Sequence, residues 1–184
     1  MLTAPPPTTA PSVRHAVVQG ESEVTRDRRV TLTTVLGSCV ACCLYDATAG
    51  VGGMNHFLLP MPPDQAPRPG DEAERYGLYA MELLVNEMLK RGATRPTMRA
   101  HLYGGANLHA GMRAIGTDND RFARTFLQSD RIALVRSDTG GTLARRLDFQ
   151  AATGRVRCRT IMDQMPDARP PRNALRAMGE VELF

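Results

Sequence analysis

A cysteine and a histidine stand close together in the sequence, in settings that could support nucleophilic chemistry. Cys39 follows a Gly37-Ser38 turn between two apolar runs, and His56 lies behind the Gly52-Gly53 pair. A cysteine attacks a carbonyl carbon as its thiolate, so it needs a base, and a histidine can accept the proton. If the fold brings Cys39 and His56 together, the two residues predict thiol chemistry on an amide or an ester.

The turn before the cysteine could supply a second requirement of such chemistry. Backbone N–H groups near Ser38 and Cys39 are free to stabilise an oxyanion. Cys42 and Cys43 lie inside the apolar run and are predicted to be small buried residues. The same structural role is the alternative for Cys39, and a surface or core imidazole is the alternative for His56.

Two other thiol sites fit parts of the pattern. Cys39 and Cys42 have C-x-x-C spacing, which in a redox protein would form a reversible disulfide, but the aromatic-Cys-Gly-Pro context is missing. Zinc could recruit Cys39, Cys42, Cys43 and His56, but no second ligand pair completes a structural set. The sequence therefore predicts no metal and no cofactor.

Bulk composition bounds the class of protein. The 184 residues suit one domain, with 42% hydrophobic and 23% charged residues. No apolar run is long enough to cross a membrane, and the N-terminus lacks the features of a signal peptide, so we expect a cytoplasmic protein without membrane insertion. The net charge of +4, no Trp, four Tyr and five Phe give little support to nucleic-acid binding.

Hydrophobic periodicity predicts strands in clusters with two helices inserted between them. The most secure helix is residues 71–91, with Asp71 as its cap and Gly92 at its end. A second helix is expected to begin near Asp118 or Asn119, and a short third one could span 172–178. The expected strands are 14–18, 30–36, 40–45, 51–59, 98–103, 132–135, 143–149 and 155–161, of which 40–45 could also begin a buried helix. This pattern predicts an α+β fold with a mixed, largely antiparallel sheet packed with two main helices.

The boundaries of the domain follow from composition. Residues 1–12 are a Pro-rich lead that we expect to be disordered, and 13–162 form the single domain. Residues 163–184 are a C-terminal extension, where proline and charge return. Residues 60–70 carry five prolines and are expected to form a loop.

Several ordered motifs make this chain similar to the CheD family of chemoreceptor glutamine deamidases. The resemblance covers about residues 13–161. The motifs are Leu36-Gly37-Ser38-Cys39-Val40-Ala41, Gly52-Gly53-Met54-Asn55-His56-Phe57-Leu58-Leu59-Pro60, Arg75-Tyr76-Gly77, Ala80-Met81-Glu82, Gly104-Gly105-Ala106, Ile115-Gly116-Thr117-Asp118-Asn119, Asp138-Thr139-Gly140-Gly141 and 145–149.

The resemblance implies an α/β layered sandwich and a catalytic set of Cys, His and Thr. The nucleophile would be Cys39 and the base His56. The threonine would be Thr33 by its spacing from the cysteine, although Thr34 is adjacent and a strand would point the two to opposite faces. Gly37, Ser38 and Asn55 would shape the site and its oxyanion pocket.

The activity that the resemblance implies is deamidation of receptor glutamines to glutamates through a thioester, with no cofactor. The implied partners are methyl-accepting chemotaxis receptors and a CheC-type phosphatase. The alternative function is a binding module with little catalysis that regulates such a phosphatase or the receptors.

Overall fold

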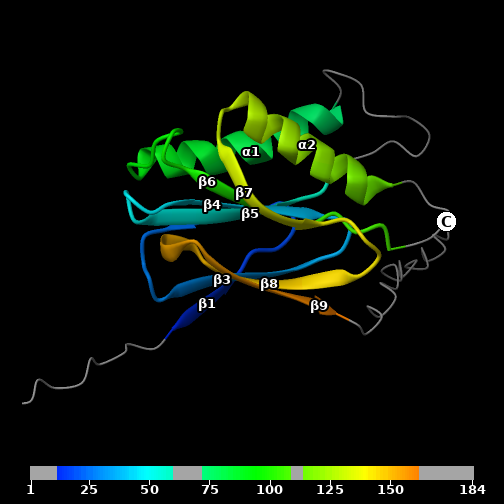
Figure 1. Ribbon diagram of the computed structural model, residues 1–184, viewed down its shortest axis with the longest axis horizontal. Coiled ribbons are helices and arrows are strands. Elements are labelled where there is room, and N and C mark those ends of the chain that lie inside the picture. The colour runs from blue at the N-terminus through cyan, green and yellow to red at the C-terminus, as the bar shows by residue number, and fades with distance from the viewer. Residues whose placement is uncertain (1–11, 60–71, 109–113, 162–184) are drawn as a thin grey trace, which may run out of the picture.

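Three layers make up the computed structural model, which describes residues 12–59, 72–108 and 114–161 (Figure 1). Two helices form the first layer. A five-stranded central sheet with the order β2-β5-β4-β6-β7 forms the second, and a four-stranded outer sheet with the order β1-β3-β8-β9 forms the third. One core fills the space between the helices and the central sheet, and a second core fills the space between the two sheets.

The central sheet is covered on both faces. Its strands are β2 (Ser22–Thr25), β5 (Val51–Phe57), β4 (Val40–Asp46), β6 (Arg99–Gly104) and β7 (Ala133–Thr139). Nearly every residue of β4 and β5 is buried, which explains why these segments are continuously apolar instead of alternating. A Cβ on Gly52 of β5 would lie 2.0 Å from the backbone oxygen of Ala151, so only glycine allows the two backbones to approach this closely.

The outer sheet has one solvent-facing side. Its strands are β1 (Val13–Ala16), β3 (Val30–Leu36), β8 (Ala144–Gln150) and β9 (Arg155–Ile161). Along β3, Leu32, Thr34 and Leu36 are buried, whereas Val35 is exposed. The strands β8 and β9 form an antiparallel hairpin, and a 3-10 turn, η1 (Ala151–Thr153), joins them.

Both helices cover the same face of the central sheet (Figure 1). They are α1 (Glu72–Lys90) and α2 (Ile115–Ser129). Met81, Leu84 and Met88 of α1 are fully buried against that sheet, as their helical spacing predicted.

The predicted fold class is confirmed, with three corrections to the elements and one to their arrangement. The strands divide into two sheets, and two of the seven pairings, β1 with β3 and β6 with β7, are parallel. The strand β2 was not predicted, because it is short and polar and is held by its antiparallel pairing with β5. The helix α2 begins at Ile115, before the expected start near Asp118 or Asn119, and β7 extends to Thr139, beyond the expected end at residue 135.

Some expectations lie outside the described residues. They are the N-terminal lead up to residue 11, the loop over 60–70, the cap at Asp71, and the C-terminal extension with its short helix at 172–178. Among the helices that the structure describes, none has the length and apolar character that a membrane span requires.

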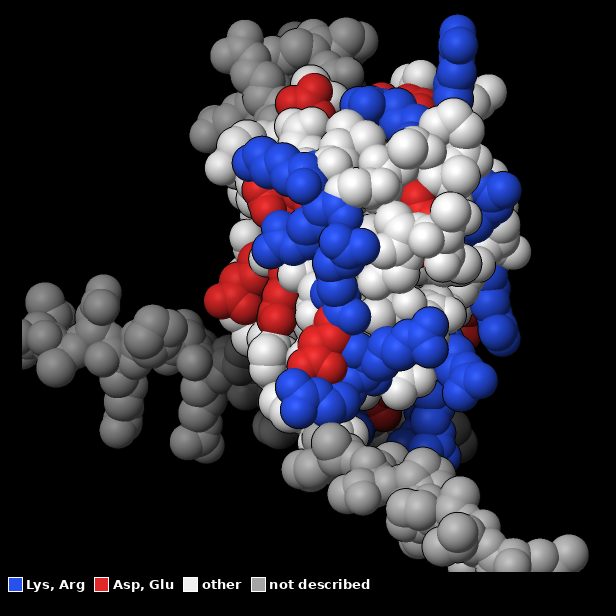
Figure 2. All heavy atoms as spheres, turned by 90° about the vertical axis from the view of Figure 1, so that its left-hand side faces the viewer, with Lys and Arg blue, Asp and Glu red and all other residues white. Residues whose placement is uncertain are grey.

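Basic side chains gather at one end of the molecule, together with several carboxylates (Figure 2). Arg29 pairs with Asp27 just before β3, and Lys90 and Arg91 pair with Glu87 at the end of α1. Cys39 lies at the opposite end of β4, roughly 20 Å away along a seven-residue strand. The positive charge at this end is therefore partly neutralised and lies far from the predicted nucleophile.

Candidate active site

The predicted nucleophile lies in the connection between the outer sheet and the central sheet. The strand β3 ends at Leu36 in the outer sheet, and β4 begins at Val40 in the central sheet. Between them, the Gly37 carbonyl accepts a hydrogen bond from the Ala106 N–H at 2.9 Å, and the Cys39 carbonyl accepts one from the Gly105 N–H at 2.7 Å. The segment after β6 therefore fixes the backbone on both sides of Ser38 and leaves the Cys39 thiol half-buried.

Asn119 of α2 holds the same turn from the helix layer. This fully buried amide accepts a hydrogen bond from the Leu59 N–H at 2.8 Å and donates one to the Ser38 carbonyl at 2.9 Å. It links the turn that carries the nucleophile to the end of the strand that carries His56. Sequence reasoning gave Asn119 no role at the site, although its position in a helix start beside Gly116-Thr117 was noted.

Replacing Asn119 should therefore destabilise the fold. Asn119→Ala leaves a buried N–H and a buried carbonyl without partners, and we expect it to lower the free energy of unfolding by about 2–4 kcal/mol. Urea unfolding followed by circular dichroism measures the change. Asn107→Ala is the matched control, because the Asn107 amide donates to the Thr117 hydroxyl at an exposed position. Equal losses in the two variants would contradict the role of Asn119.

His56 lies on the same face of the central sheet as Cys39. In the register of β4 and β5, His56 is opposite Ala41, which is two residues after Cys39. Side chains two residues apart on a strand share a face, so Cys39 is a diagonal neighbour of His56. Ala41, Cys43 and Cys39 all contact the core between the two sheets, which confirms the direction of this face.

Hydrogen bonds to one ring nitrogen fix the imidazole of His56. Its Nδ1 lies 2.9 Å from the Thr34 hydroxyl and 3.3 Å from the Val17 carbonyl oxygen. A carbonyl can only accept, so the proton of the neutral imidazole is on Nδ1. The Nε2 atom is then the basic nitrogen. It is buried and has no hydrogen-bond partner among the described residues.

The threonine in this contact is Thr34, and the sequence-based choice of Thr33 is corrected. Successive side chains of β3 point to opposite faces of the outer sheet, and the even-numbered residues face the core between the sheets. Thr34 is 7% exposed and faces His56 across that core. Thr33 is on the other face, where its strand neighbours are Ala16 and Asp148.

Removing the Thr34 hydroxyl should lower activity more than removing that of Thr33. Thr34→Val loses one buried hydrogen bond to His56, worth about 1 kcal/mol, or about fivefold in kcat/KM. Thr33→Val is the matched control on the same strand and should remain close to wild type. Initial rates of ammonia release measure both. The reverse order of losses would restore Thr33 as the partner of His56.

Burial shifts the pKa values of both candidate residues in the direction that favours their neutral forms. Desolvation lowers the pKa of His56 below its ordinary 6.5, opposed by the hydrogen bond to the Val17 carbonyl. Desolvation also raises the pKa of the Cys39 thiol above its ordinary 9.0. The resting site therefore holds a neutral thiol and a neutral imidazole at neutral pH, which suits proton transfer to His56 during the attack.

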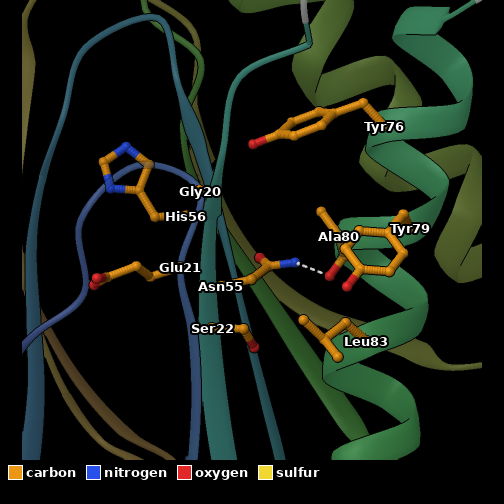
Figure 3. Close-up of a pocket in the computed structure, with 9 residues that line it drawn as sticks. All are labelled: Gly20, Glu21, Ser22, Asn55, His56, Tyr76, Tyr79, Ala80 and Leu83. Atoms are coloured by element: carbon orange, nitrogen blue, oxygen red, sulfur yellow. Dashed lines mark hydrogen bonds between the residues drawn. The ribbon is translucent and has the colours of Figure 1, made fainter.

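Asn55 does not face the thiol, which corrects its expected place in an oxyanion pocket. Its amide donates to the Ala80 carbonyl at 3.0 Å, and its side-chain oxygen accepts from the Cys42 N–H at 3.0 Å. Figure 3 shows Asn55 pointing toward α1 and His56 pointing away from it. Neighbouring strand residues face opposite sides, so Asn55 shapes the site only by tying β4 and β5 to α1.

A pocket lies beside His56, between the turn before β2 and the helix α1 (Figure 3). Tyr76, Tyr79 and Leu83 of α1 line one wall, and Gly20 and Ser22 are on the opposite side. Tyr79 is 64% exposed. Cys39 does not line this pocket.

The other cysteines of the run do not join Cys39 in a shared site. Cys42 faces the core under the helices, whereas Cys39 and Cys43 face the core between the sheets. All four cysteines of the chain are free thiols, and burial raises the pKa of Cys42 and Cys43 strongly. Cys39 and Cys42 therefore cannot close a C-x-x-C disulfide in this fold. No group of three metal-ligating side chains converges within residues 12–59, 72–108 and 114–161.

A residue that sequence reasoning missed contacts the thiol. The Cys39 Sγ lies 3.4 Å from Oε1 of Gln19, in the turn between β1 and β2. Only the folded chain could reveal this pair, because the two residues are 20 positions apart and lie in two separate connections from the outer sheet to the central sheet. Nothing in the sequence around Gln19 predicts it.

Comparisons with known proteins identify the family of this chain. A family model described as "CheD chemotactic sensory transduction" matches residues 58–160. A protein of Caulobacter vibrioides named "Probable chemoreceptor glutamine deamidase CheD" is 51% identical over 94% of each chain. The chain belongs to the CheD family. Further CheD proteins bear the same name in Zymomonas mobilis, at 51% identity over 82% of this chain and 81% of the relative, and in Sinorhizobium medicae, at 43% over 89% and 94%.

One solved structure also overlaps with this fold at a low level. A hypothetical protein YfiH of Bacillus licheniformis superposes with a TM-score of 0.44 and 14% identity, covering 74% of this chain and 62% of that one.

Proposed function

We propose that this CheD protein deamidates glutamine side chains of chemoreceptors, with Cys39 as nucleophile and His56 as base. The names of its relatives support the reaction and the class of substrate. The observation that carries the chemistry is the imidazole of His56, with Nδ1 held by Thr34 and Val17 and with a buried, unpaired Nε2 on the face that Cys39 shares.

The first half of the reaction makes a thioester. His56 Nε2 takes the proton from the Cys39 thiol, and the thiolate attacks the carboxamide carbon of the substrate glutamine. The amide C=O becomes an oxyanion in the tetrahedral intermediate. The C–N bond then breaks, the nitrogen takes the proton from His56, and ammonia leaves. The Thr34 hydroxyl and the Val17 carbonyl stabilise the imidazolium that forms in between.

The second half releases glutamate. Water gives a proton to His56 and attacks the thioester carbon, and the C–S bond breaks as the cysteine recovers its proton. The receptor gains one carboxylate for each amide lost. No metal or organic cofactor takes part in any step. The product is a glutamate that a methyltransferase could then esterify, as the CheD resemblance implies.

The cellular setting follows from the same proposal. Chemoreceptor segments that are adjusted during adaptation lie in the cytoplasm, and four reduced cysteines suit that compartment. We also propose a CheC-type phosphatase as a second partner, on the family resemblance alone. The basic end of the molecule would leave Cys39 free if an acidic partner docked there (Figure 2).

Incubation with purified cytoplasmic fragments of chemoreceptors tests the function. We expect release of ammonia in step with an amide-to-acid mass change, located at particular glutamines by peptide mass spectrometry. A receptor fragment whose modified glutamines are changed to Glu is the control and should release no ammonia. Unchanged masses after prolonged incubation with several receptors would reject the proposal.

A further inference from the structure

The carboxamide of Gln19 contacts the nucleophile, and the reaction outlined above gives it no task. Its Oε1 accepts a hydrogen bond from the Cys39 thiol at 3.4 Å. Gln19 lies on the exposed surface, yet its side chain is directed to the half-buried thiol. A carboxamide offers an acceptor oxygen and a donor NH2 on one flat group, so the same side chain can also donate.

The turn that carries Gln19 is fixed to the residues of the site. The Glu21 N–H donates to the Val18 carbonyl at 3.0 Å and closes a β-turn, and Gly20 takes the left-handed φ of +90° that such a turn needs. The Gly20 N–H donates to the His56 carbonyl at 2.8 Å, and the His56 N–H donates to the Glu21 carbonyl at 3.0 Å. The turn therefore holds Gln19 in a constant position relative to His56.

The oxyanion of the proposed reaction needs donors, and Asn55 cannot be one of them. Its NH2 is taken by the Ala80 carbonyl on the opposite face of the central sheet. The backbone N–H of Ser38 is available, because it makes no hydrogen bond to the residues that the structure describes. A second donor from another segment would complete the pair that acyl-transfer sites commonly use.

The chemistry of the thiol decides which end of the carboxamide faces it. A neutral thiol can donate to Oε1, as it does in the resting structure. The sulfur of a thiolate and the oxyanion of the tetrahedral intermediate can only accept hydrogen bonds. The terminal torsion of glutamine is soft and roughly two-fold, so the amide can turn its NH2 to the negative charge. The oxyanion is only two bonds from Sγ, within reach of a donor that already contacts the sulfur.

We propose that Gln19 is a further catalytic residue, whose carboxamide NH2 donates to the oxyanion together with the backbone N–H of Ser38. This inference rests on the proposed function, because it requires Cys39 to be the nucleophile. It replaces the donor that the sequence led us to expect at Asn55. It also gives the turn between β1 and β2 a catalytic task in addition to its contact with Nδ1 of His56.

Steady-state kinetics of ammonia release from a chemoreceptor fragment test the proposal. Gln19→Met keeps the length of the side chain and removes the donor, so we expect kcat to fall roughly 10²-fold. KM should change less than about threefold, because the donor acts in the transition state and not in substrate binding. Gln19→Glu keeps the shape and adds a negative charge, so kcat should fall further than in Gln19→Met. Gln150→Ala, at the end of β8, is the control glutamine and should match wild type.

The outcomes separate this inference from the function on which it rests. A Gln19→Met variant with wild-type kcat would overturn the donor role, and so would a raised kcat/KM, which would mean that Gln19 competes with the substrate. Alkylation of Cys39 by iodoacetamide should proceed in Gln19→Met, which shows that the thiol is intact and reachable. If Cys39→Ala retained activity, the proposed nucleophile itself would be wrong, whatever the Gln19 variants do.

Discussion

Cys39→Ala is expected to abolish deamidation of chemoreceptor fragments, with a loss of at least about 10³-fold in kcat. The substitution removes the sulfur that forms the thioester, and no other thiol can replace it. Cys42 and Cys43 are fully buried, and Cys42 is on the opposite face of β4. Cys39→Ser should be inactive as well, although it keeps a donor for Gln19, because a neutral hydroxyl is a much weaker nucleophile in this setting.

Cys158→Ala is the matched control for a partly exposed cysteine. Burial raises the pKa of the Cys158 thiol to about 11, and the residue belongs to β9 of the outer sheet. Its variant should keep wild-type rates of ammonia release. Equal rates of ammonia release in wild type and Cys39→Ala would reject Cys39 as the nucleophile. No release by either protein would favour the alternative function, a binding module that regulates a phosphatase or the receptors.

Replacement of His56 should have the second largest effect. His56→Gln removes the base and the later acid, so kcat should fall roughly 10²–10⁴-fold. His101→Gln is the matched control, because His101 is also a buried histidine of the central sheet whose pKa is lowered by burial. It lies on β6 and packs against Tyr45 and Tyr103, and in the strand register it is opposite Cys43. A His56→Gln enzyme with wild-type kcat would reject the base.

The pH profile of the wild-type protein should carry the signature of the buried imidazole. The base acts in its neutral form, and burial lowers its pKa, so the acid limb of kcat/KM should lie below pH 6.5. The raised pKa of the Cys39 thiol keeps the nucleophile protonated through neutral pH. The rate of deamidation should therefore show no alkaline decline before about pH 9. A midpoint above 6.5 would mean that His56 gains stabilisation of its charged form in the free enzyme.

Local sequence was sufficient to predict most of the elements and to propose a thiol chemistry. The β-branched run at Val30–Leu36 and the helical spacing of Met81, Leu84 and Met88 predicted β3 and α1 correctly. Cys39 and His56 could be selected because a Gly-Ser turn and a Gly pair place them near strand ends. Short-range preferences decide these features, and the sequence displays them directly.

The tertiary structure decided which neighbours face the site. Alternation along a strand told us that Thr33 and Thr34 point to opposite sides, but only the packing of the two sheets makes the side of Thr34 the inner one. The same alternation turns Asn55 to α1 and His56 to Thr34.

The contacts of Gln19 and Asn119 were also decided by the tertiary structure, because their partners are distant in the sequence. Gln19 reaches Cys39 from a turn 20 residues earlier, and Asn119 reaches Ser38 from a helix 81 residues later. The sequence by itself determined which residues to propose as the reactive pair of this CheD protein, because a thiol and an imidazole are recognisable by residue type. Amides and hydroxyls are common residues that gain a role only from their neighbours in space, and the layers of the fold bring those neighbours together.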